Sequence, residues 1–194
     1  MKKRGFTVWF TGLSGSGKTT MATMVGQALV GRGTTVEILD GDTIRTHLSK
    51  GLGYSKEDRD TNIRRIGWVC QLLTKHGVSN IAAAISPYQA TRDEVRRMVE
   101  KVGGKGSFIE VFLNCPLEVC EQRDTKGLYQ RARRGENLNF TGISDPCEPP
   151  AAPELVLDTA KETSLESARK VDKILESLAW TLNVEQVGNT NEKC

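Results

Sequence analysis

Apolar residues along this chain follow two kinds of pattern, short continuous runs and stretches with helical spacing. Runs rich in β-branched, aromatic and small apolar residues predict buried strands at 6–10, 36–39, 78–85, 108–113 and 155–157. Apolar positions that recur every three or four residues predict helices at 20–30, 56–76, 89–102, 117–123 and 163–182. Because strands that alternate with helices form parallel sheets covered on both faces, the pattern predicts a three-layer α/β/α fold with a central parallel β-sheet.

Two of these helices are preceded by a capping sequence. Ser55 stands three residues before Asp58, and Thr163 stands three residues before Glu166. In such a pair the hydroxyl accepts a hydrogen bond from a backbone N–H of the first turn, which the helix itself leaves unpaired. We therefore expect helices to begin directly after Ser55 and Thr163.

The stretch Gly-Leu-Ser-Gly-Ser-Gly-Lys-Thr (12–19) lies between the first predicted strand and the first predicted helix. This is the glycine-rich pattern of a P-loop in the strand–loop–helix context that a P-loop requires. Its backbone N–H groups and the positive end of the helix would hold phosphate oxygens. Lys18 would neutralise the β- and γ-phosphates, and the Thr19 hydroxyl would complete the shell of a Mg²⁺ ion. A glycine-rich turn unrelated to phosphate is the alternative, but both flanks fit a P-loop NTPase fold that binds a nucleoside triphosphate.

Residues 124–153 depart from the alternating pattern. They are rich in Arg, Lys, Gly and Pro, poor in aliphatic residues, and too long for an ordinary connection. In a P-loop protein such a stretch is a candidate lid that closes on substrate and excludes water. We expect one domain over residues 1–183, with this lid segment, followed by a polar tail at 184–194.

Composition narrows the function classes. The chain has 194 residues with 27 Lys and Arg against 24 Asp and Glu, a net charge of +3 that is too small to indicate nucleic-acid binding. Five scattered cysteines without paired spacing predict free thiols and a reducing compartment. We see no signal peptide and no apolar run of membrane-spanning length, so we expect a cytoplasmic protein without a membrane or nucleic-acid partner.

Acidic residues follow the second predicted strand. Asp40 and Asp42 stand at its carboxyl end, where open α/β sheets place their ligands. A carboxylate there would orient an acceptor hydroxyl, take its proton, or bind Mg²⁺. Asp-Gly-Asp is equally suited to a β-turn, and from these residues alone the two interpretations are even.

The arginine cluster and Ser86 can each be interpreted in two ways, as part of a functional site or as an ordinary structural feature. Four arginines with an asparagine between them suit phosphate or sulfate, although solvated arginines on a helix face are the commoner case; these residues are Arg45, Arg59, Asn62, Arg64 and Arg65. Ser86 precedes Pro87, so its side chain is either the cap of the next helix or a catalytic group.

Taken together, seven stretches resemble the adenylylsulfate kinase (APS kinase) family, in order and with sensible spacing. The resemblance runs from about Phe6 to Leu182. The stretches begin with Gly-Leu-Ser-Gly-Ser-Gly-Lys-Thr-Thr (12–20), Leu-Asp-Gly-Asp (39–42) and Gly-Leu-Gly-Tyr-Ser (51–55). They continue with Asp-Arg-Asp-Thr-Asn-Ile-Arg-Arg-Ile-Gly (58–67), Ile-Ser-Pro-Tyr (85–88), Pro-Leu-Glu-Val-Cys-Glu-Gln-Arg-Asp-Thr-Lys-Gly-Leu-Tyr (116–129) and Phe-Thr-Gly-Ile-Ser-Asp-Pro (140–146).

The resemblance implies transfer of the ATP γ-phosphoryl to the 3′-hydroxyl of adenosine 5′-phosphosulfate (APS), which gives 3′-phosphoadenosine 5′-phosphosulfate (PAPS) and ADP in sulfate assimilation. Catalytic residues would be Lys18, Asp40, Asp42 and Ser86, and Mg²⁺ would be held by Thr19 and Asp40. ATP would be bound by Gly12, Leu13, Ser14, Gly15, Ser16, Gly17, Lys18, Thr19, Thr20, Lys126, Arg131 and Arg133. APS would be bound by Asp42, Arg45, Tyr54, Arg59, Asn62, Ile85, Ser86, Lys126 and Phe140, with Tyr54 and Phe140 on the two faces of its adenine.

Some positions depart from the family pattern. Tyr54 replaces the usual Phe, and stacking should survive because both rings offer a π-face. Cys147 stands where Tyr is usual and would alter lid packing, and Trp68 stands where polar residues are common. The family serine at Ser86 is traditionally described as a phosphoserine intermediate, but direct in-line transfer fits P-loop chemistry better.

The resemblance also implies a homodimer, and we expect ATP sulfurylase to be a separate protein. Two other functions are weighed against this one. One is a P-loop kinase for another small acceptor, such as a sugar, shikimate or a nucleoside monophosphate, but the pair Tyr54 and Phe140 and the arginine cluster favour a nucleotide-like anionic acceptor. A nucleotide-dependent switch would hydrolyse ATP slowly without an acceptor, and the arginine-rich lid fits a transferase better.

Overall fold

The computed structural model describes residues 5–136 and 139–178. The predicted tail at 184–194, the end of the last predicted helix beyond residue 178, and Cys194 lie outside the described residues. The four described cysteines are free thiols, as predicted, and three of them are buried.

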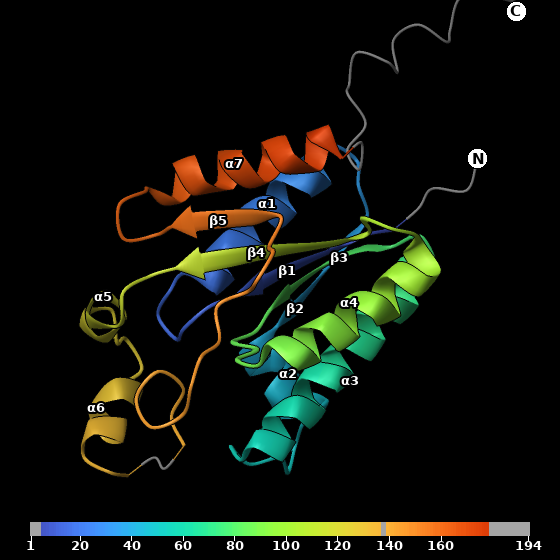
Figure 1. The fold of residues 1–194 in the computed structure, drawn as a ribbon. Helices are drawn as coiled ribbons and strands as arrows, with labels where there is room; N and C mark the ends of the chain where they lie inside the picture. Colours follow the sequence, from blue (N-terminus) through green and yellow to red (C-terminus); the bar gives the residue numbers. More distant parts are fainter. Residues whose placement is uncertain (1–4, 137–138, 179–194) are drawn as a thin grey trace, which may run out of the picture.

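A five-stranded parallel sheet forms the centre of the protein, which confirms the predicted fold (Figure 1). Its strands lie in the order β2-β3-β1-β4-β5, and every neighbouring pair is parallel. The strands are β1 (Thr7–Thr11), β2 (Val36–Asp40), β3 (Ser79–Ala83), β4 (Phe108–Asn114) and β5 (Leu155–Asp158). The central strand β1 and its neighbour β3 are fully buried, as expected for a sheet covered on both faces.

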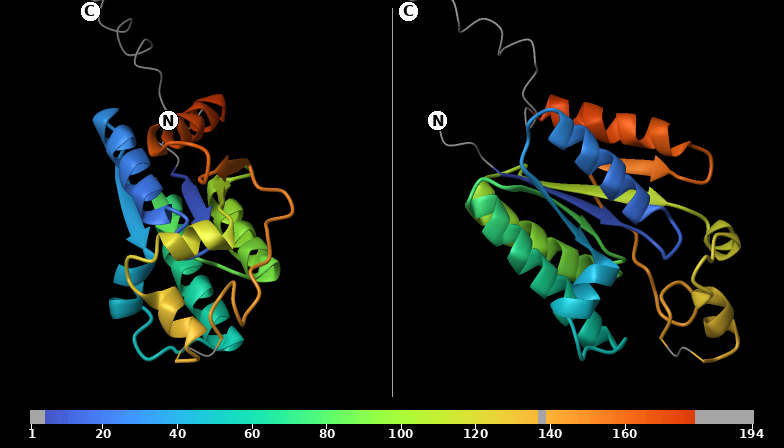
Figure 2. Two further views of the ribbon diagram at one scale, coloured as in Figure 1. Left: turned by 90° about the vertical axis from the view of Figure 1, so that its left-hand side faces the viewer. Right: turned by 180° about the vertical axis from the view of Figure 1, so that it is seen from behind.

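Helices cover both faces of this sheet. They are α1 (Lys18–Gly31), α2 (Gly41–His47), α3 (Lys56–Lys75), α4 (Gln89–Gly103), α5 (Leu117–Gln122), α6 (Leu128–Arg133) and α7 (Ser164–Ser177). Figures 1 and 2 show α1 and α7 on one face and α3 and α4 on the other. Each face has its own apolar core, one centred on Phe10 and Val25, the other on Trp9 and Ile66.

Both predicted caps are present. The Ser55 hydroxyl accepts a hydrogen bond from the N–H of Asp58 at 3.1 Å, and Thr163 forms a reciprocal capping box with Glu166. Two short helices were not predicted. One is α2, which replaces the turn considered at Asp40-Gly41-Asp42, and the other is α6 within the predicted lid segment.

A third, smaller apolar cluster holds part of the lid segment against the rest of the protein. Its buried members are Cys115, Cys120 and Tyr129, and Leu13 and Phe140 pack against it. Because the strands are parallel, their carboxyl ends and the loops that follow them meet at one edge of the sheet. This edge carries the P-loop, α2, α5 and the lid segment (Figure 1). No helix of the described residues is long and apolar enough to cross a membrane.

Candidate active site

One cavity of about 730 Å³ lies at the carboxyl edge of the sheet. The P-loop, the end of β2, the loop after β3 and the lid segment all contribute to its wall. Of the predicted residues, those that line it are Ser14, Gly15, Ser16, Gly17, Lys18, Thr19, Thr20, Asp40, Asp42, Arg45, Tyr54, Arg59, Asn62, Ile85, Ser86, Lys126 and Phe140. The structure thus brings most of the predicted donor residues and all of the predicted acceptor residues into one space.

The P-loop owes its shape to glycines at strained positions. Gly12 has φ 147°, and a Cβ there would approach the Leu113 carbonyl oxygen to 2.7 Å. Gly17 has φ 99° and directly precedes α1, so the first turn of this helix faces the loop. The loop therefore turns tightly enough to aim its N–H groups at a single anion.

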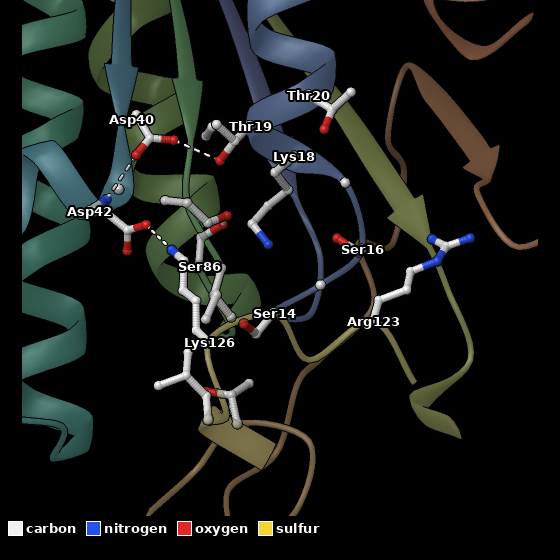
Figure 3. Close-up of a pocket in the computed structure, with 18 of the residues that line it drawn as sticks. Ser14, Ser16, Lys18, Thr19, Thr20, Asp40, Asp42, Ser86, Arg123 and Lys126 are labelled. Atoms are coloured by element: carbon white, nitrogen blue, oxygen red, sulfur yellow. Dashed lines mark hydrogen bonds and ion pairs between the residues drawn. The ribbon is translucent and has the colours of Figure 1, made fainter. Parts of the chain in front are cut away.

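Lys18 extends into the space that the P-loop encloses (Figure 3). Its Nζ donates to the carbonyl oxygens of Gly12 at 3.0 Å and Leu13 at 2.6 Å. Burial lowers the pKa of Lys18 to about 8, although the nearby carboxylates of Asp40 and Asp42 partly oppose the shift. Gly12 and Leu13 do not line the cavity, and their carbonyl groups position the ammonium instead.

Asp40 joins the P-loop to α2. One carboxylate oxygen accepts a hydrogen bond from the Thr19 hydroxyl at 2.8 Å, and the other accepts from the N–H of Asp42 at 3.1 Å, which caps α2. Asp42 lies one residue into this helix, and its largely exposed carboxylate pairs with the Lys126 ammonium of the lid segment (Figure 3). The two carboxylates thus face the P-loop and the lid, respectively.

The oxygen atoms of Thr19 and Asp40 fit a magnesium site. Among the described residues no group of three or more His, Cys, Asp or Glu forms a cage for a metal ion. A P-loop Mg²⁺ needs no such cage, because it takes one or two hard protein oxygens and completes its shell with phosphate and water. The Thr19 hydroxyl and the Asp40 carboxylate, 2.8 Å apart, are donors of that kind.

Ser86 is held in a chain of buried hydrogen bonds. Its Oγ accepts from the Trp9 indole N–H at 3.1 Å and donates to the Thr11 hydroxyl at 2.8 Å, which in turn donates to the Ile85 carbonyl oxygen at 2.7 Å. Its backbone is in the left-handed region, with φ 43°. Of the two alternatives for Ser86, the structure excludes the helix cap, because the capping position of α4 is Tyr88.

The arginine cluster divides into two groups. Arg45 and Arg59 line the cavity, and their guanidinium carbons lie 4.5 and 5.6 Å from the centre of the Tyr54 ring. Arg64 pairs with Glu94 at 2.9 Å on the surface, and Arg65 donates to the Leu48 carbonyl oxygen. Neither Arg64 nor Arg65 lines the cavity, so the helix-face alternative holds for these two.

Arg59 is the buried member of the first group. Its Nε donates to the Tyr54 carbonyl oxygen at 3.0 Å, its Nη2 donates to the Asn139 carbonyl oxygen, and the guanidinium pairs with Asp145 at 3.6 Å. Burial lowers its pKa. Asn62, one helical turn further on, is also buried, and its Oδ1 has no hydrogen-bond partner within the described residues.

Only some of the site residues predicted in the lid segment line the cavity. Lys126 and Phe140 line the cavity, whereas Arg131 and Arg133 do not. Arg133 pairs with Glu121 at 2.6 Å, and neither residue lines the cavity. The structure therefore does not bring Arg131 and Arg133 to the predicted ATP site.

A further lobe of the cavity was missed by the sequence reasoning. Arg123 follows α5 and donates to the Thr159 carbonyl oxygen at 2.9 Å, and Thr159 and Thr163 line the same space after β5. The Thr159 Oγ1 is buried without a hydrogen-bond partner within the described residues. Thr159 directly follows the end of β5, as the P-loop follows β1, and that position in the sequence is the signal that could have identified it.

Comparisons with known proteins agree on one family. The sequence model of the family described as adenylylsulphate kinase matches residues 4–158. An adenylyl-sulfate kinase from Synechococcus sp. (strain JA-2-3B'a(2-13)) is 56% identical over 178 residues, which are 92% of this chain and 97% of that protein. The solved APS kinase of Mycobacterium tuberculosis in complex with AMPPNP and APS has a TM-score of 0.84 and 43% identity, covering 89% of this chain and 98% of its own. A hexameric APS kinase from Thiobacillus denitrificans has a TM-score of 0.72 and 37% identity, covering 93% of this chain and 30% of its own.

Proposed function

The chain belongs to the adenylylsulphate kinase family, and from that premise we propose how its residues perform the reaction. The protein transfers the γ-phosphoryl group of ATP to the 3′-hydroxyl of APS and yields PAPS and ADP. The alternatives with another small-molecule acceptor or with a switch function are set aside, because 56% identity extends over nearly the whole length of an adenylyl-sulfate kinase. What remains to be proposed is the role of each residue.

The donor site is formed by the P-loop. Backbone N–H groups of residues 14–20 would hold the β- and γ-phosphates of ATP, and the Lys18 ammonium would neutralise them. Thr19 and Asp40 would hold Mg²⁺, which neutralises charge on the phosphates when it is bound. The adenosine end of ATP would lie in the lobe between Arg123 and Thr159. The 2.8 Å contact between Thr19 and Asp40 supports the metal assignment.

The acceptor site lies between α2, α3 and the lid segment. Tyr54 and Phe140 would stack on the two faces of the APS adenine, and Arg45 would attract its phosphosulfate group. The Ile85–Ser86 backbone and the buried Asn62 amide would contact the nucleoside. Support comes from the cavity itself, since residues of both half-sites line one continuous space.

Phosphoryl transfer would be direct. The 3′-oxygen of APS forms a bond to the γ-phosphorus, the bond between that phosphorus and the β–γ bridging oxygen breaks, and the hydroxyl proton passes to Asp42. Lys126, which pairs with Asp42, would use its ammonium to stabilise the negative charge that develops on the transferred phosphoryl group in the transition state. Ser86 would act by position and not as a nucleophile, because its hydroxyl is buried and already donates to Thr11.

The observation that carries this assignment is the placement of the two carboxylates, Asp40 against Thr19 of the P-loop and Asp42 against Lys126 of the lid segment. A coupled ADP-release assay tests the assignment. Mg·ATP is offered with APS, AMP, shikimate, gluconate or no acceptor, and the expected result is turnover with APS alone and a product with a new 3′-phosphate. Asp42→Asn should retain binding of both substrates and lose turnover, whereas Glu37→Gln, an exposed carboxylate on β2 outside the cavity, should retain turnover. Turnover of the Asp42→Asn variant near the wild-type rate would remove Asp42 from the mechanism.

We also propose a homodimer, a cytoplasmic location and a separate ATP sulfurylase, as the family resemblance implies. The free thiols of the described residues suit a reducing compartment. One similar protein is described as hexameric, so light scattering on the purified chain would distinguish a dimer from a larger assembly. A monomer or hexamer would overturn the dimer proposal.

A further inference from the structure

Tyr129, on the lid helix α6, contacts both halves of the cavity wall and was not among the predicted site residues. Its side chain is 2% exposed. Its hydroxyl donates to the Ser14 carbonyl oxygen of the P-loop at 2.9 Å. Its ring lies 5.0 Å from the ring of Phe140, at an angle of 70°. One side chain thus contacts the loop proposed for ATP and the ring proposed for the APS adenine.

The position of Tyr129 is fixed by hydrogen bonds at the start of α6 and by the packing of its ring. Asp124 accepts hydrogen bonds from the N–H groups of residues 128, 129 and 130 at 2.8, 2.8 and 3.1 Å, which holds the first turn of α6. The ring is buried in the small cluster with Cys115 and Cys120. Burial raises the pKa of the Tyr129 phenol, so the hydroxyl remains a donor throughout the neutral range.

A second contact joins the lid and the P-loop independently of Tyr129. A Cβ at Gly142, which has φ 89°, would lie 2.8 Å from the side chain of Leu13. Gly142 belongs to the tight turn in which the Phe140 carbonyl oxygen accepts hydrogen bonds from the N–H groups of residues 143, 144 and 145. The turn that carries Phe140 therefore rests on the P-loop next to the residue that Tyr129 holds.

We propose that Tyr129 is a positioning residue with two separable parts, a hydroxyl that holds the P-loop at Ser14 for ATP and a ring that supports Phe140 for the APS adenine. The inference rests on the proposed function of these two half-sites. The hydroxyl reaches across 115 positions of the chain to a backbone carbonyl of the P-loop. The two rings are arranged edge to face, a geometry in which aromatic side chains attract each other.

The two parts predict different losses of affinity. Tyr129→Phe removes the hydroxyl and keeps the ring, so the Kd of AMPPNP with Mg²⁺ should rise about fivefold, the effect of one buried hydrogen bond, while the Kd of APS stays within about twofold. Tyr129→Leu removes both parts, so the Kd of APS should also rise, by roughly three- to tenfold. If the Leu variant does not fold, Tyr129→Met fills the space better and replaces it.

Isothermal titration of the full chain with AMPPNP·Mg²⁺ and with APS, separately, measures both constants. Tyr88→Phe is the matched control, because the Tyr88 hydroxyl donates to Asp145 of the lid at 2.8 Å and does not contact the P-loop. The control should leave the Kd of AMPPNP unchanged. For Tyr129→Phe, an unchanged Kd of AMPPNP, or a rise in the Kd of APS equal to the rise in the Kd of AMPPNP, would overturn the proposal. A wild-type protein that does not bind APS would instead refute the proposed acceptor site.

Discussion

The pH dependence of ATP use follows from the burial of Lys18. Lys18 is half-buried as a residue, and burial of its ammonium lowers the pKa from 10.5 to about 8. Removing the side chain from water disfavours the charged form, so the protein loses this charge as the pH rises through 8. Because the ammonium is the form that neutralises phosphates, productive binding of ATP requires the proton.

The magnitude follows from the pKa. A group with a pKa of about 8 is about 90% charged at pH 7 and about 10% charged at pH 9, so kcat/KM for ATP should fall roughly tenfold over that interval. The value of kcat should fall less, because bound phosphates favour the charged form and raise the pKa in the complex.

The ADP-release assay at saturating APS, run from pH 7 to 9.5, measures both constants. Lys18→Arg provides the control, since a guanidinium stays charged over this range. It should be slower, because its planar fork does not fit a site shaped for a compact ammonium, but its profile should be flat. If kcat/KM of the wild-type enzyme were also flat to pH 9.5, burial would not control this lysine and the argument would fail.

Three further variants test other parts of the structure. Asp42→Asn should lower kcat by about 100-fold or more with an unchanged circular dichroism spectrum, and a smaller loss would contradict its role as base. Glu110→Gln leaves the buried Arg92 guanidinium without its 2.8 Å ion pair, so the free energy of unfolding should fall by about 3–5 kcal/mol; a melting temperature within about 2 °C of wild type would be inconsistent with this. Ser86→Ala should keep turnover within about tenfold, with no phosphate label on the wild-type protein, whereas a labelled protein and an inactive variant would support a covalent intermediate.

The hydrophobic patterns were sufficient to predict the fold, because in the long strands and helices the local pattern of apolar residues matches the faces that are buried in the folded protein. The strand at 108–113 is apolar over nearly its whole length, as a strand covered on both faces must be, and the structure extends it by one residue. The helices α2 and α6, of seven and six residues, contain too few turns for a period to identify them reliably, although α5, which is equally short, was predicted. Their formation depends on Asp40 and Asp124, whose carboxylates accept the first N–H groups of each helix.

Ser86 shows where local reasoning gives the wrong partner. A serine before a proline is a common helix start, and the sequence offers no nearer competitor for its hydroxyl. In the folded chain Trp9, 77 residues earlier, lies on the adjacent strand and donates its indole N–H to that hydroxyl. An indole N–H buried at 0% exposure must be paired. The first N–H of α4 does not need Ser86, because Gln89 N–H donates to the Glu148 carboxylate at 2.7 Å. Only the register of β1 against β3 brings these two residues together.

Arg59 shows a different limit, because the sequence identified the residue but not what it contacts. A buried arginine beside a predicted anion site suggests a direct contact with the phosphosulfate group. In the structure its nitrogens donate to the carbonyl oxygens of Tyr54 and Asn139, two residues that both line the cavity, and its charge is balanced by Asp145. The guanidinium therefore sets the spacing between Tyr54 and the residue before Phe140 as well as contributing charge. A lysine would have to donate every bond from its single Nζ, whereas the planar guanidinium donates from Nε and Nη2 in two fixed directions, so the residue type follows from the geometry of the wall.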